Sequence, residues 1–422
     1  MANCYLPGAG EGWLGLNRRG GVMLRRISAA IFAICFPAAA PAAAQGADDP
    51  FAAFAPYSEA TRYQIDHTPW DDFLRRAVFE VGRSDREPAR SSGNQFRIAG
   101  TRLTTASRSR YRFEGNRVMF HTFDRDVIEY IGLYRDALQD TMNRVDYGDF
   151  SRNEQLAYWL NLYNAVVIHE IAKAHPVSRP GRIRAGENGE RLYEAKLVTV
   201  YGVALSLNDI KYKIVYRYWR DTDVLYGFWD GVIGGPGIIS DAFAGDRVGG
   251  QLAINGREFV NSMRGVDKVR DSVRISKIYH DARPYFFPDW PGDLYIHLNR
   301  HADYRTADIL SARPENPRAS RFDINTADAE SGETVRPPVS DNSAAVAAGA
   351  DLGSRWANLS STAMRGGLSG EALELSRRAE TRLSRRTGTV VILDVYTDDP
   401  DTPPPQSLTV ESDEAASQDD PE

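Results

Sequence analysis

The chain has 422 residues and a formal net charge of −6, with 42% hydrophobic and 26% charged residues. This composition is globular and excludes a chain that is fibrous or disordered throughout. The acidic balance argues against a general nucleic-acid-binding protein. Beyond the N-terminus, no apolar run approaches the ~20 residues that span a bilayer. We therefore expect no nucleic-acid partner and no integral membrane protein.

The N-terminus has the pattern of a secretory signal peptide. Arg25–Arg26 precede a short apolar core, Ile27–Phe36, and Ala42–Ala44 then offer a cleavage site. We predict that residues 1–44 are a signal peptide, that Met23 is the true start, and that the protein is periplasmic or secreted. A buried N-terminal helix is the alternative.

Cleavage near Ala44 would remove both cysteines, Cys4 and Cys35. A mature chain without cysteine suits an oxidising compartment. It also has no thiolate, so no thiol mechanism is open to it.

Amphipathic spacing predicts two helices in the first third of the mature chain. The first begins at Thr68–Pro69, and the second covers about 125–145. Ser151 and Glu154 then have the spacing of a capping box. The helix that follows is apolar on nearly every side from Leu156 to Ile171, which is typical of the centre of a domain.

Shorter elements follow this central helix. The patterns predict a strand at 197–201, a second capping box at Ser206–Asp209, a helix at 210–219, a strand at 224–229, a glycine-rich loop at 230–237, a helix at 246–263, a strand at 269–276 and a helix at 291–303. We therefore predict an α+β fold, a single helix-rich domain over residues 60–304 with a small sheet around a buried central helix.

The C-terminal quarter changes in composition. Residues 305–354 are rich in Pro, Ser, Ala, Asn and Asp, which predicts a disordered linker. Residues 355–398 are predicted to hold a helix and a strand that returns to the domain. The acidic, proline-containing segment 399–422 is predicted to be a disordered tail.

The central helix carries a sequence signature. Asn153-Glu-Gln-Leu-Ala-Tyr-Trp-Leu-Asn-Leu-Tyr-Asn-Ala165 resembles the helix motif of a bacterial and plant family known as domain of unknown function 547. Gly202–Ile210 and, more weakly, Ile275–Tyr279 resemble two further segments of that family. The resemblance covers roughly 60–304 and implies a papain-like or transglutaminase-like fold.

The chain departs from the family pattern at one segment. Family members usually carry a histidine and two cysteines there. Aligned on Pro236, this sequence has Leu225 in place of the histidine, and Asp230 and Gly235 in place of the cysteines. The resemblance thus implies the fold but not cysteine–histidine chemistry.

Several residues of the central helix and the glycine-rich loop could form a binding site. Buried amides need partners, so Asn161 and Asn164 either line a polar pocket or hold neighbouring backbone. Trp159 and Tyr163, which are aromatic and one helical turn apart, either line a ligand site or pack in the core. The loop either offers amides to an anion or makes a tight turn. The predicted binding residues are Trp159, Asn161, Tyr163, Asn164, Gly234 and Gly235.

Titratable residues supply only weak catalytic and metal candidates. Asp230 could act as a base, and His280 is a second candidate. His297 and His301 are spaced i and i+4 on a helix, as two ligands of one metal would be, with Asp293 one turn earlier. They lack the glutamate of a zinc-protease motif. We therefore predict no metal and no cofactor.

Two functions remain open. The first is a non-catalytic or degenerate module that binds an unknown small-molecule or envelope ligand. The second is a hydrolase that uses Asp and His in place of Cys. An enzyme requires Asp230, an amide of Asn161 or Asn164 and a basic side chain to meet in one open cleft.

Overall fold

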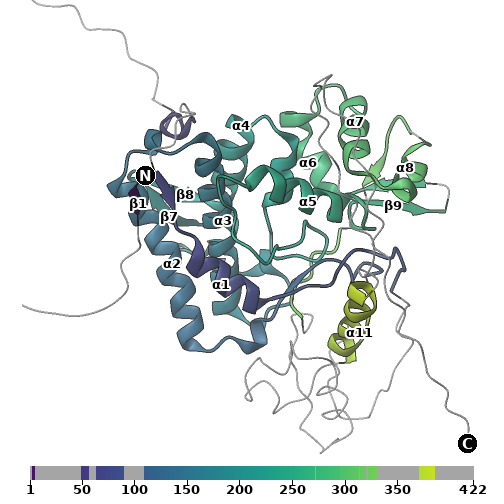
Figure 1. Cartoon of the computed structure of the whole chain (residues 1–422), viewed down its shortest axis with the longest axis horizontal. Helices are drawn as coiled ribbons and strands as arrows, with labels where there is room; N and C mark the ends of the chain where they lie inside the picture. The colour runs from purple at the N-terminus through teal and green to yellow at the C-terminus, as the bar shows by residue number, and fades with distance from the viewer. Residues whose placement is uncertain are drawn as a thin grey trace, which may run out of the picture. The chain divides into compact units, whose positions relative to one another are not determined.

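The computed structural model describes residues 2–4, 49–56, 63–89, 109–270, 272–312, 314–319, 322–329 and 370–384. The chain divides into two units, Met1–Arg385 and Arg386–Glu422. The predicted strand after residue 388 and the predicted acidic tail fall in the second unit, outside the described residues. Nearly all of the predicted signal peptide, which belongs to the first unit, also lies outside the described residues. Every element below belongs to the first unit (Figure 1).

Helices form most of the described regular structure. The α-helices are α1 (Thr68–Ala77), α2 (Arg125–Arg144), α3 (Arg152–Ala174), α4 (Tyr216–Tyr218), α5 (Val248–Val260), α6 (Lys277–Phe286), α7 (Gly292–His301), α8 (Tyr304–Leu310) and α11 (Gly370–Ser384). Short 3₁₀ helices are η1 (Ala52–Phe54), η2 (Phe120–Thr122), η3 (Tyr147–Asp149), η4 (Pro180–Arg182) and η6 (Thr222–Gly227), and η5 (Asp209–Val215) is a π-helix.

The strands form several small sheets. The pairs are β1 (Ala2–Cys4) with β2 (Tyr63–Ile65), β3 (Val78–Phe79) with β4 (Arg117–Val118), β5 (Arg184–Ala185) with β6 (Glu190–Arg191), and β7 (Lys196–Val200) with β8 (Val203–Ser206). A three-stranded sheet has the order β11 (Arg318–Ala319), β10 (Ser272–Ile275) and β9 (Val266–Val269). The predicted α+β class is confirmed, although several separate two- and three-stranded sheets take the place of the one small sheet we expected.

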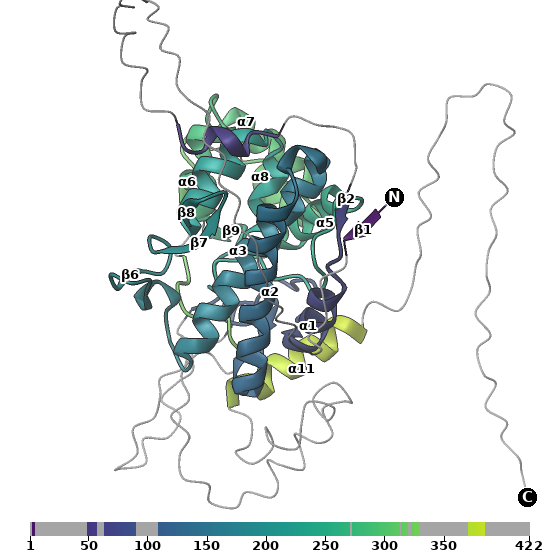
Figure 2. The same cartoon turned by 90° about the vertical axis from the view of Figure 1, so that its left-hand side faces the viewer.

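Helix α3 is the buried centre of the domain, as its sequence predicts. Every residue from Glu154 to Ala172 is buried, and Trp159 and Leu160 are fully enclosed. Helix α2 runs alongside α3 in both views (Figures 1 and 2). The 3₁₀ helix η1 adds Phe54, whose ring lies edge-on to Trp159 at 5.2 Å. The domain therefore includes residues before position 60.

The two predicted capping boxes have different outcomes. Ser151 accepts a hydrogen bond from the Glu154 amide at 3.1 Å, but the Glu154 carboxylate does not return to Ser151. It accepts instead from the amides of Ile65, at 2.9 Å, and Gly245, at 3.1 Å. Because these amides belong to distant segments, Glu154 connects the start of α3 to β2 and to the loop before α5.

The second box forms completely. The Asp209 amide donates to Ser206 Oγ at 3.1 Å, and the Ser206 amide donates to Asp209 Oδ2 at 2.9 Å. The helix that follows differs from the prediction, since it is the π-helix η5 followed by the single turn α4. Single π turns occur often at functional sites, so the side chains of η5 need close inspection.

Two other predicted elements change. Residues 224–229 were expected as a strand, but most of them lie in η6. The N-cap residue of η6 is Asp221, whose carboxylate accepts from the Asp223 amide at 3.0 Å. A short apolar run cannot distinguish a strand from a buried helical turn. The expected strand at 269–276 is the turn and second strand of the β9–β10 hairpin.

Part of the expected linker is ordered and belongs to the domain. Helix α8 forms, and residues 322–329 return to the core, where Thr326 and Asp328 are buried. The Ala327 amide donates to the Gly231 carbonyl at 2.8 Å, and the Gly234 amide donates to the Asp323 carbonyl at 2.8 Å. Backbone hydrogen bonds, which composition does not reveal, hold this polar segment in place.

Helix α11 covers a second, smaller apolar cluster. Leu375 and Ala379 are buried there, together with Phe79, Val81, Ala89, Phe113, Met119 and Ala329. Arg382 holds the end of the helix through two bonds to the Asp85 carboxylate, at 2.9 and 3.0 Å. The helix predicted within 355–398 is therefore present and packs on the domain.

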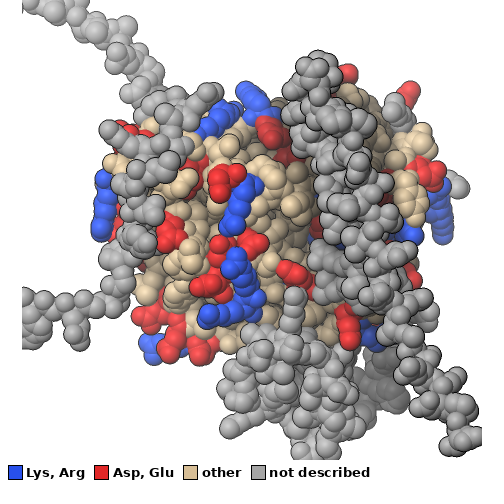
Figure 3. Space-filling view, in the orientation of Figure 1, with Lys and Arg blue, Asp and Glu red and all other residues tan. Residues whose placement is uncertain are grey.

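Acidic and basic side chains are mixed on the described surface. Figure 3 shows both signs next to each other on one face instead of a continuous basic area. Arg75, for example, pairs with Asp241 at 2.9 Å. None of the described helices is long and apolar enough to cross a membrane.

Candidate functional site

Asp230, the first residue of the glycine-rich loop, is the centre of a polar cluster. Its carboxylate accepts from Lys211 Nζ at 2.9 and 3.1 Å and from the Tyr163 hydroxyl at 2.5 Å. The Tyr193 hydroxyl donates to the Asp230 carbonyl at 2.5 Å. The cluster thus joins α3, the π-helix η5 and the start of the glycine-rich loop.

The cluster is mostly withdrawn from water. The Lys211 side chain is 9% exposed and that of Asp230 is 20% exposed. Burial disfavours the charged form of Lys211, but the attraction of the Asp230 carboxylate outweighs burial and raises the pKa of the lysine. Burial, and then the same carboxylate, raise the pKa of Tyr163. Lys211 therefore stays protonated, and Tyr163 stays a donor.

The aromatic rings around Lys211 strengthen this arrangement. Its Nζ lies 5.9 Å from the centre of the Tyr163 ring, 5.8 Å from that of Tyr212 and 5.4 Å from that of Phe228. A cation within about 6 Å of a ring is stabilised by the ring quadrupole. Sequence analysis missed Lys211, although a lysine between apolar residues next to a buried helix was a usable signal.

Asn161 and Asn164 hold backbone on both sides of the central helix. Asn161 donates to the Phe243 carbonyl at 2.7 Å and accepts from the Phe243 amide at 2.9 Å. Asn164 donates to the Gly227 carbonyl at 3.1 Å and accepts from the Trp229 amide at 3.0 Å. Of the two alternatives we gave for these amides, the geometry corresponds to holding backbone.

The two aromatic candidates on α3 are also enclosed. Trp159 donates its indole N–H to the Tyr147 hydroxyl at 2.9 Å and is fully buried. Tyr163 is 1% exposed and packs edge-on to Phe228, with ring centres 4.8 Å apart. Neither lines a pocket described below.

The amides of the glycine-rich loop are used within the protein. Gly234 donates to Asp323, and the Ile233 amide donates to the Asn325 carbonyl at 2.9 Å. A Cβ at Gly234 would lie 2.6 Å from the Asp323 amide nitrogen, so the close backbone approach requires glycine there. The Gly235 amide donates to the Val232 carbonyl at 3.4 Å. The loop is a tight turn against the returning segment 322–329.

His280 does not join Asp230. It lies on α6 with its ring 5.0 Å from that of Trp290, and burial lowers its pKa. No hydrogen bond connects it to the Asp230 cluster in the described part of the chain. Of the three groups that a hydrolase would require in one cleft, Asp230 does meet a basic side chain, that of Lys211, but the side-chain amides of Asn161 and Asn164 are bonded to backbone instead.

The two histidines of α7 do meet a carboxylate, but not that of Asp293. His301 Nε2 lies 2.8 Å from Asp223 Oδ1, and His297 Nδ1 lies 3.9 Å from the same oxygen. All three residues are buried, and one ligand atom from each lies within 4.8 Å of the others. Asp293 instead accepts from the Asp289 amide at 2.8 Å. Asp223, supplied by η6, had no signal in the sequence.

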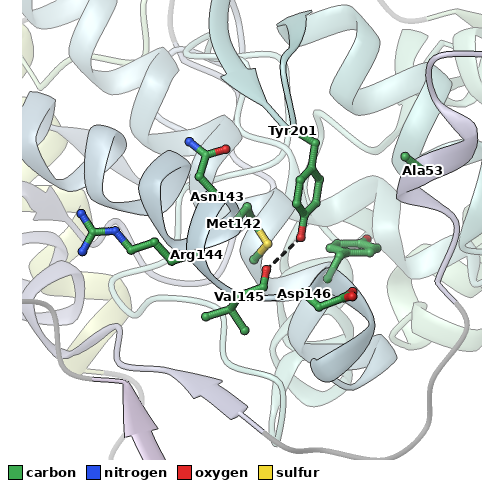
Figure 4. Close-up of a pocket in the computed structure, with 8 residues that line it drawn as sticks. Ala53, Met142, Asn143, Arg144, Val145, Asp146 and Tyr201 are labelled. Carbon is green, nitrogen blue, oxygen red and sulfur yellow. Dashed lines mark hydrogen bonds between the residues drawn. The ribbon is translucent and has the colours of Figure 1, made fainter. Parts of the chain in front are cut away.

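One pocket of about 360 Å³ lies where α2 ends, next to Tyr201. Tyr201 points toward Val145 and donates to its carbonyl at 2.9 Å, while Arg144 points away from the ring (Figure 4). The residues that line this pocket are Ala53, Met142, Asn143, Arg144, Val145, Asp146, Tyr147 and Tyr201. They bring together no acid–base pair.

A second pocket, of about 300 Å³, combines aromatic walls with cationic side chains. It is lined by Phe51, Tyr212, Lys213, Arg217, Arg220, Pro284 and Tyr285, and we call it the basic pocket. The Tyr212 and Tyr285 rings lie 6.1 Å apart and are inclined by 27°. Lys213 Nζ lies 5.0 Å from the centre of the Phe51 ring. The sequence had not indicated this site.

Comparison with known families finds a match for the central part of the chain. Residues 147–260 match the family described as protein of unknown function, DUF547. The matched segment contains α3, η5, η6 and α5 and includes the helix motif whose resemblance to this family we described from the sequence. No curated protein and no solved structure matches the chain.

Proposed function

We propose that this chain is an exported, non-catalytic member of its family that binds an anionic ligand of the cell envelope. The observation that carries the proposal is the set of contacts that Asp230 makes. The residue that we align with a family cysteine is bound by a lysine and two tyrosines, and its ion-pair partner Lys211 is 9% exposed.

A general base must be free to take a proton from a bound reactant. The Asp230 oxygens already accept from Lys211 and Tyr163, and Lys211 is held in its charged form. Removing Lys211 or Asp230 alone would leave the other charge without its partner. The cluster therefore fits a structural role, in which an ion pair fills the place of the absent cysteine.

The basic pocket supplies the binding role. Lys213 and Arg217 are both exposed and both pair with carboxylates, those of Asp209 and Asp49 respectively. Arg220 is exposed and has no ion-pair partner within the described residues. Tyrosine faces beside several cations suit a ligand that combines a ring with negative charge. Acidic saccharides of the envelope have this chemistry.

A thermal-shift experiment on the mature protein tests the binding role. We expect a galacturonic-acid oligosaccharide to raise the melting temperature, because it binds only the folded state. A neutral galactose oligosaccharide of equal length should not, and added salt should weaken the effect. Arg220→Ala and Tyr285→Ala should reduce the shift, while Arg191→Ala, at an exposed arginine of β6, should not. An equal shift in all three variants would contradict the assignment.

Export has its own test. The signal-peptide pattern at Arg25–Arg26 and Ala42–Ala44 supports it. Mass spectrometry of the protein recovered from the periplasm or the medium should find an N-terminus near Gln45. Intact chain beginning at Met1 in the cytoplasm would overturn this part of the proposal. Cleavage would also remove β1, so β2 must then persist through its bridge between Tyr63 and Phe150.

The hydrolase alternative rests on one observation, the 20% exposure of the Asp230 side chain, which leaves a path for a small reactant. Asp230→Asn distinguishes the two functions. If the chain hydrolyses ester or amide probes, this variant should abolish turnover while still binding the acidic oligosaccharide. If the chain only binds, neither form should turn over any probe.

A further inference from the structure

The buried cluster on α7 and η6 has the composition of a metal site. Two imidazoles and one carboxylate come together from two elements: His297 and His301 are 2% and 5% exposed, and Asp223 is 8% exposed. We propose that Asp223, His297 and His301 bind a divalent transition-metal ion of the Zn²⁺ class. This site is separate from the Asp230 cluster and from the basic pocket, and it does not depend on the proposed function.

The spacing of the donor atoms supports a single ion. Zinc bonds of about 2.0–2.2 Å in a tetrahedral site place ligand atoms a little over 3 Å apart. Here, His301 Nε2 and Asp223 Oδ1 are 2.8 Å apart, and His297 Nδ1 and the same oxygen are 3.9 Å apart. Small rotations of the side chains would bring all three to one ion. The i, i+4 spacing on α7 holds both rings on one face of the helix.

Neighbouring groups hold the His297 ring in the orientation that ligation by Nδ1 requires. The Tyr226 hydroxyl lies 2.6 Å from His297 Nε2, and the Tyr279 hydroxyl lies 3.3 Å from that of Tyr226. The Tyr226 ring also stacks on the His297 ring, inclined by 11°. Metal-bound histidines nearly always donate their second N–H to such a partner, which fixes the tautomer.

A fourth ligand is available beside the three. The Thr222 hydroxyl lies 2.8 Å from His297 Nδ1. It could direct a water into the remaining position or ligate the ion itself. The mixed nitrogen and oxygen donors favour zinc-like ions over Mg²⁺.

Metal content and stability measured on the full chain without a histidine tag test this site. After incubation with ZnCl₂ and desalting, we expect elemental analysis to find close to one zinc per chain. Zn²⁺, but not Mg²⁺, should raise the melting temperature of chelator-treated protein. Co²⁺ loading should give the visible absorption of a four-coordinate nitrogen and oxygen site. Because this spectrum is recorded on the parent protein, it reports the ligand set even if a ligand variant folds poorly.

Matched variants locate the ion. Asp223→Asn and His301→Gln keep side-chain size and should weaken zinc binding roughly 100-fold or more, since each removes a ligand. His280→Gln, on neighbouring α6, should bind zinc as the parent does. The proposal is overturned if the parent retains no zinc and shows no thermal shift. It is equally overturned if Asp223→Asn and His301→Gln bind zinc as the parent does, because Cys4, Cys35 or other residues would then hold it.

Discussion

Lys211 and Asp230 form an ion pair that joins the π-helix η5 to the first residue of the glycine-rich loop, with nitrogen–oxygen distances of 2.9 and 3.1 Å. Because the lysine is almost fully buried, its charge depends on this one carboxylate. The two residues should therefore behave as a unit in mutagenesis.

Lys211→Met tests that unit. It leaves the Asp230 carboxylate without its cation and should lower the free energy of unfolding by ~3 kcal/mol, measured by urea denaturation. Adding Asp230→Asn should restore part of the loss, since no unpaired charge then remains. Lys213→Met is the control. Its pair with Asp209 is 56% exposed on the lysine side, and its loss should change stability by less than about 1 kcal/mol. Equal effects of the two lysine variants would contradict the structural role.

Leu160 and Gly227 should show compensation. Leu160 is fully buried, and Leu160→Ala should cost ~2–5 kcal/mol through the cavity it leaves. A Cβ added at Gly227 would lie 2.6 Å from Leu160 Cδ2, so Gly227→Ala should also destabilise the protein. In the double variant the new methyl enters the cavity, and the loss should be smaller than the sum of the two single losses. Strict additivity in urea denaturation would mean that the two side chains do not meet.

His67 should make stability fall in mild acid. Its ring is buried, Nδ1 lies 2.8 Å from the Tyr134 hydroxyl, and burial lowers its pKa from 6.5 to about 4. Between pH 6.5 and 4 the unfolded chain takes up a proton at this residue and the folded chain does not. The contribution of His67 to the free energy of unfolding is thus fully present above pH 6.5. It decreases as the pH falls, by up to ~3 kcal/mol near pH 4.

The test compares urea midpoints at pH 7 and pH 4.5. His67→Gln should reduce the difference between the two pH values, because glutamine takes up no proton. Tyr134→Phe should keep most of the difference, because the histidine remains buried. An unchanged difference in His67→Gln would show that other groups control the acid response.

Arg382 should hold α11 on the domain. Its guanidinium makes two bonds to Asp85 and one, at 2.7 Å, to the Phe113 carbonyl, and its side chain is 2% exposed. Bonds to charged groups contribute about 1.5–3 kcal/mol. In Arg382→Gln, hydrogen-exchange mass spectrometry should find faster exchange in the peptide that contains residues 370–384. Arg377→Gln, at an exposed arginine paired with Glu374, is the matched control, and equal exchange in both variants would refute the anchor.

The sequence by itself determined the helices and caps that depend on a repeated pattern of neighbouring residues. The extents of α2, α3 and α7, the Ser151 and Ser206 caps and the central, buried position of α3 all follow from residues within a few turns of each other. Spacing of 3.6 residues and a capping side chain act on neighbouring backbone, so they are visible without a fold. The family motif in α3 is local in the same way.

Only the tertiary structure decided which distant groups meet. Glu154 has the spacing of a cap but bonds to Ile65 and Gly245, and Asp223, not Asp293, reaches His297 and His301. The Lys211–Asp230 pair and the return of residues 322–329 onto the glycine-rich loop are of the same kind. These contacts depend on how helices and loops pack, and a carboxylate satisfies whichever donors that packing presents. Local sequence carries no information about those donors.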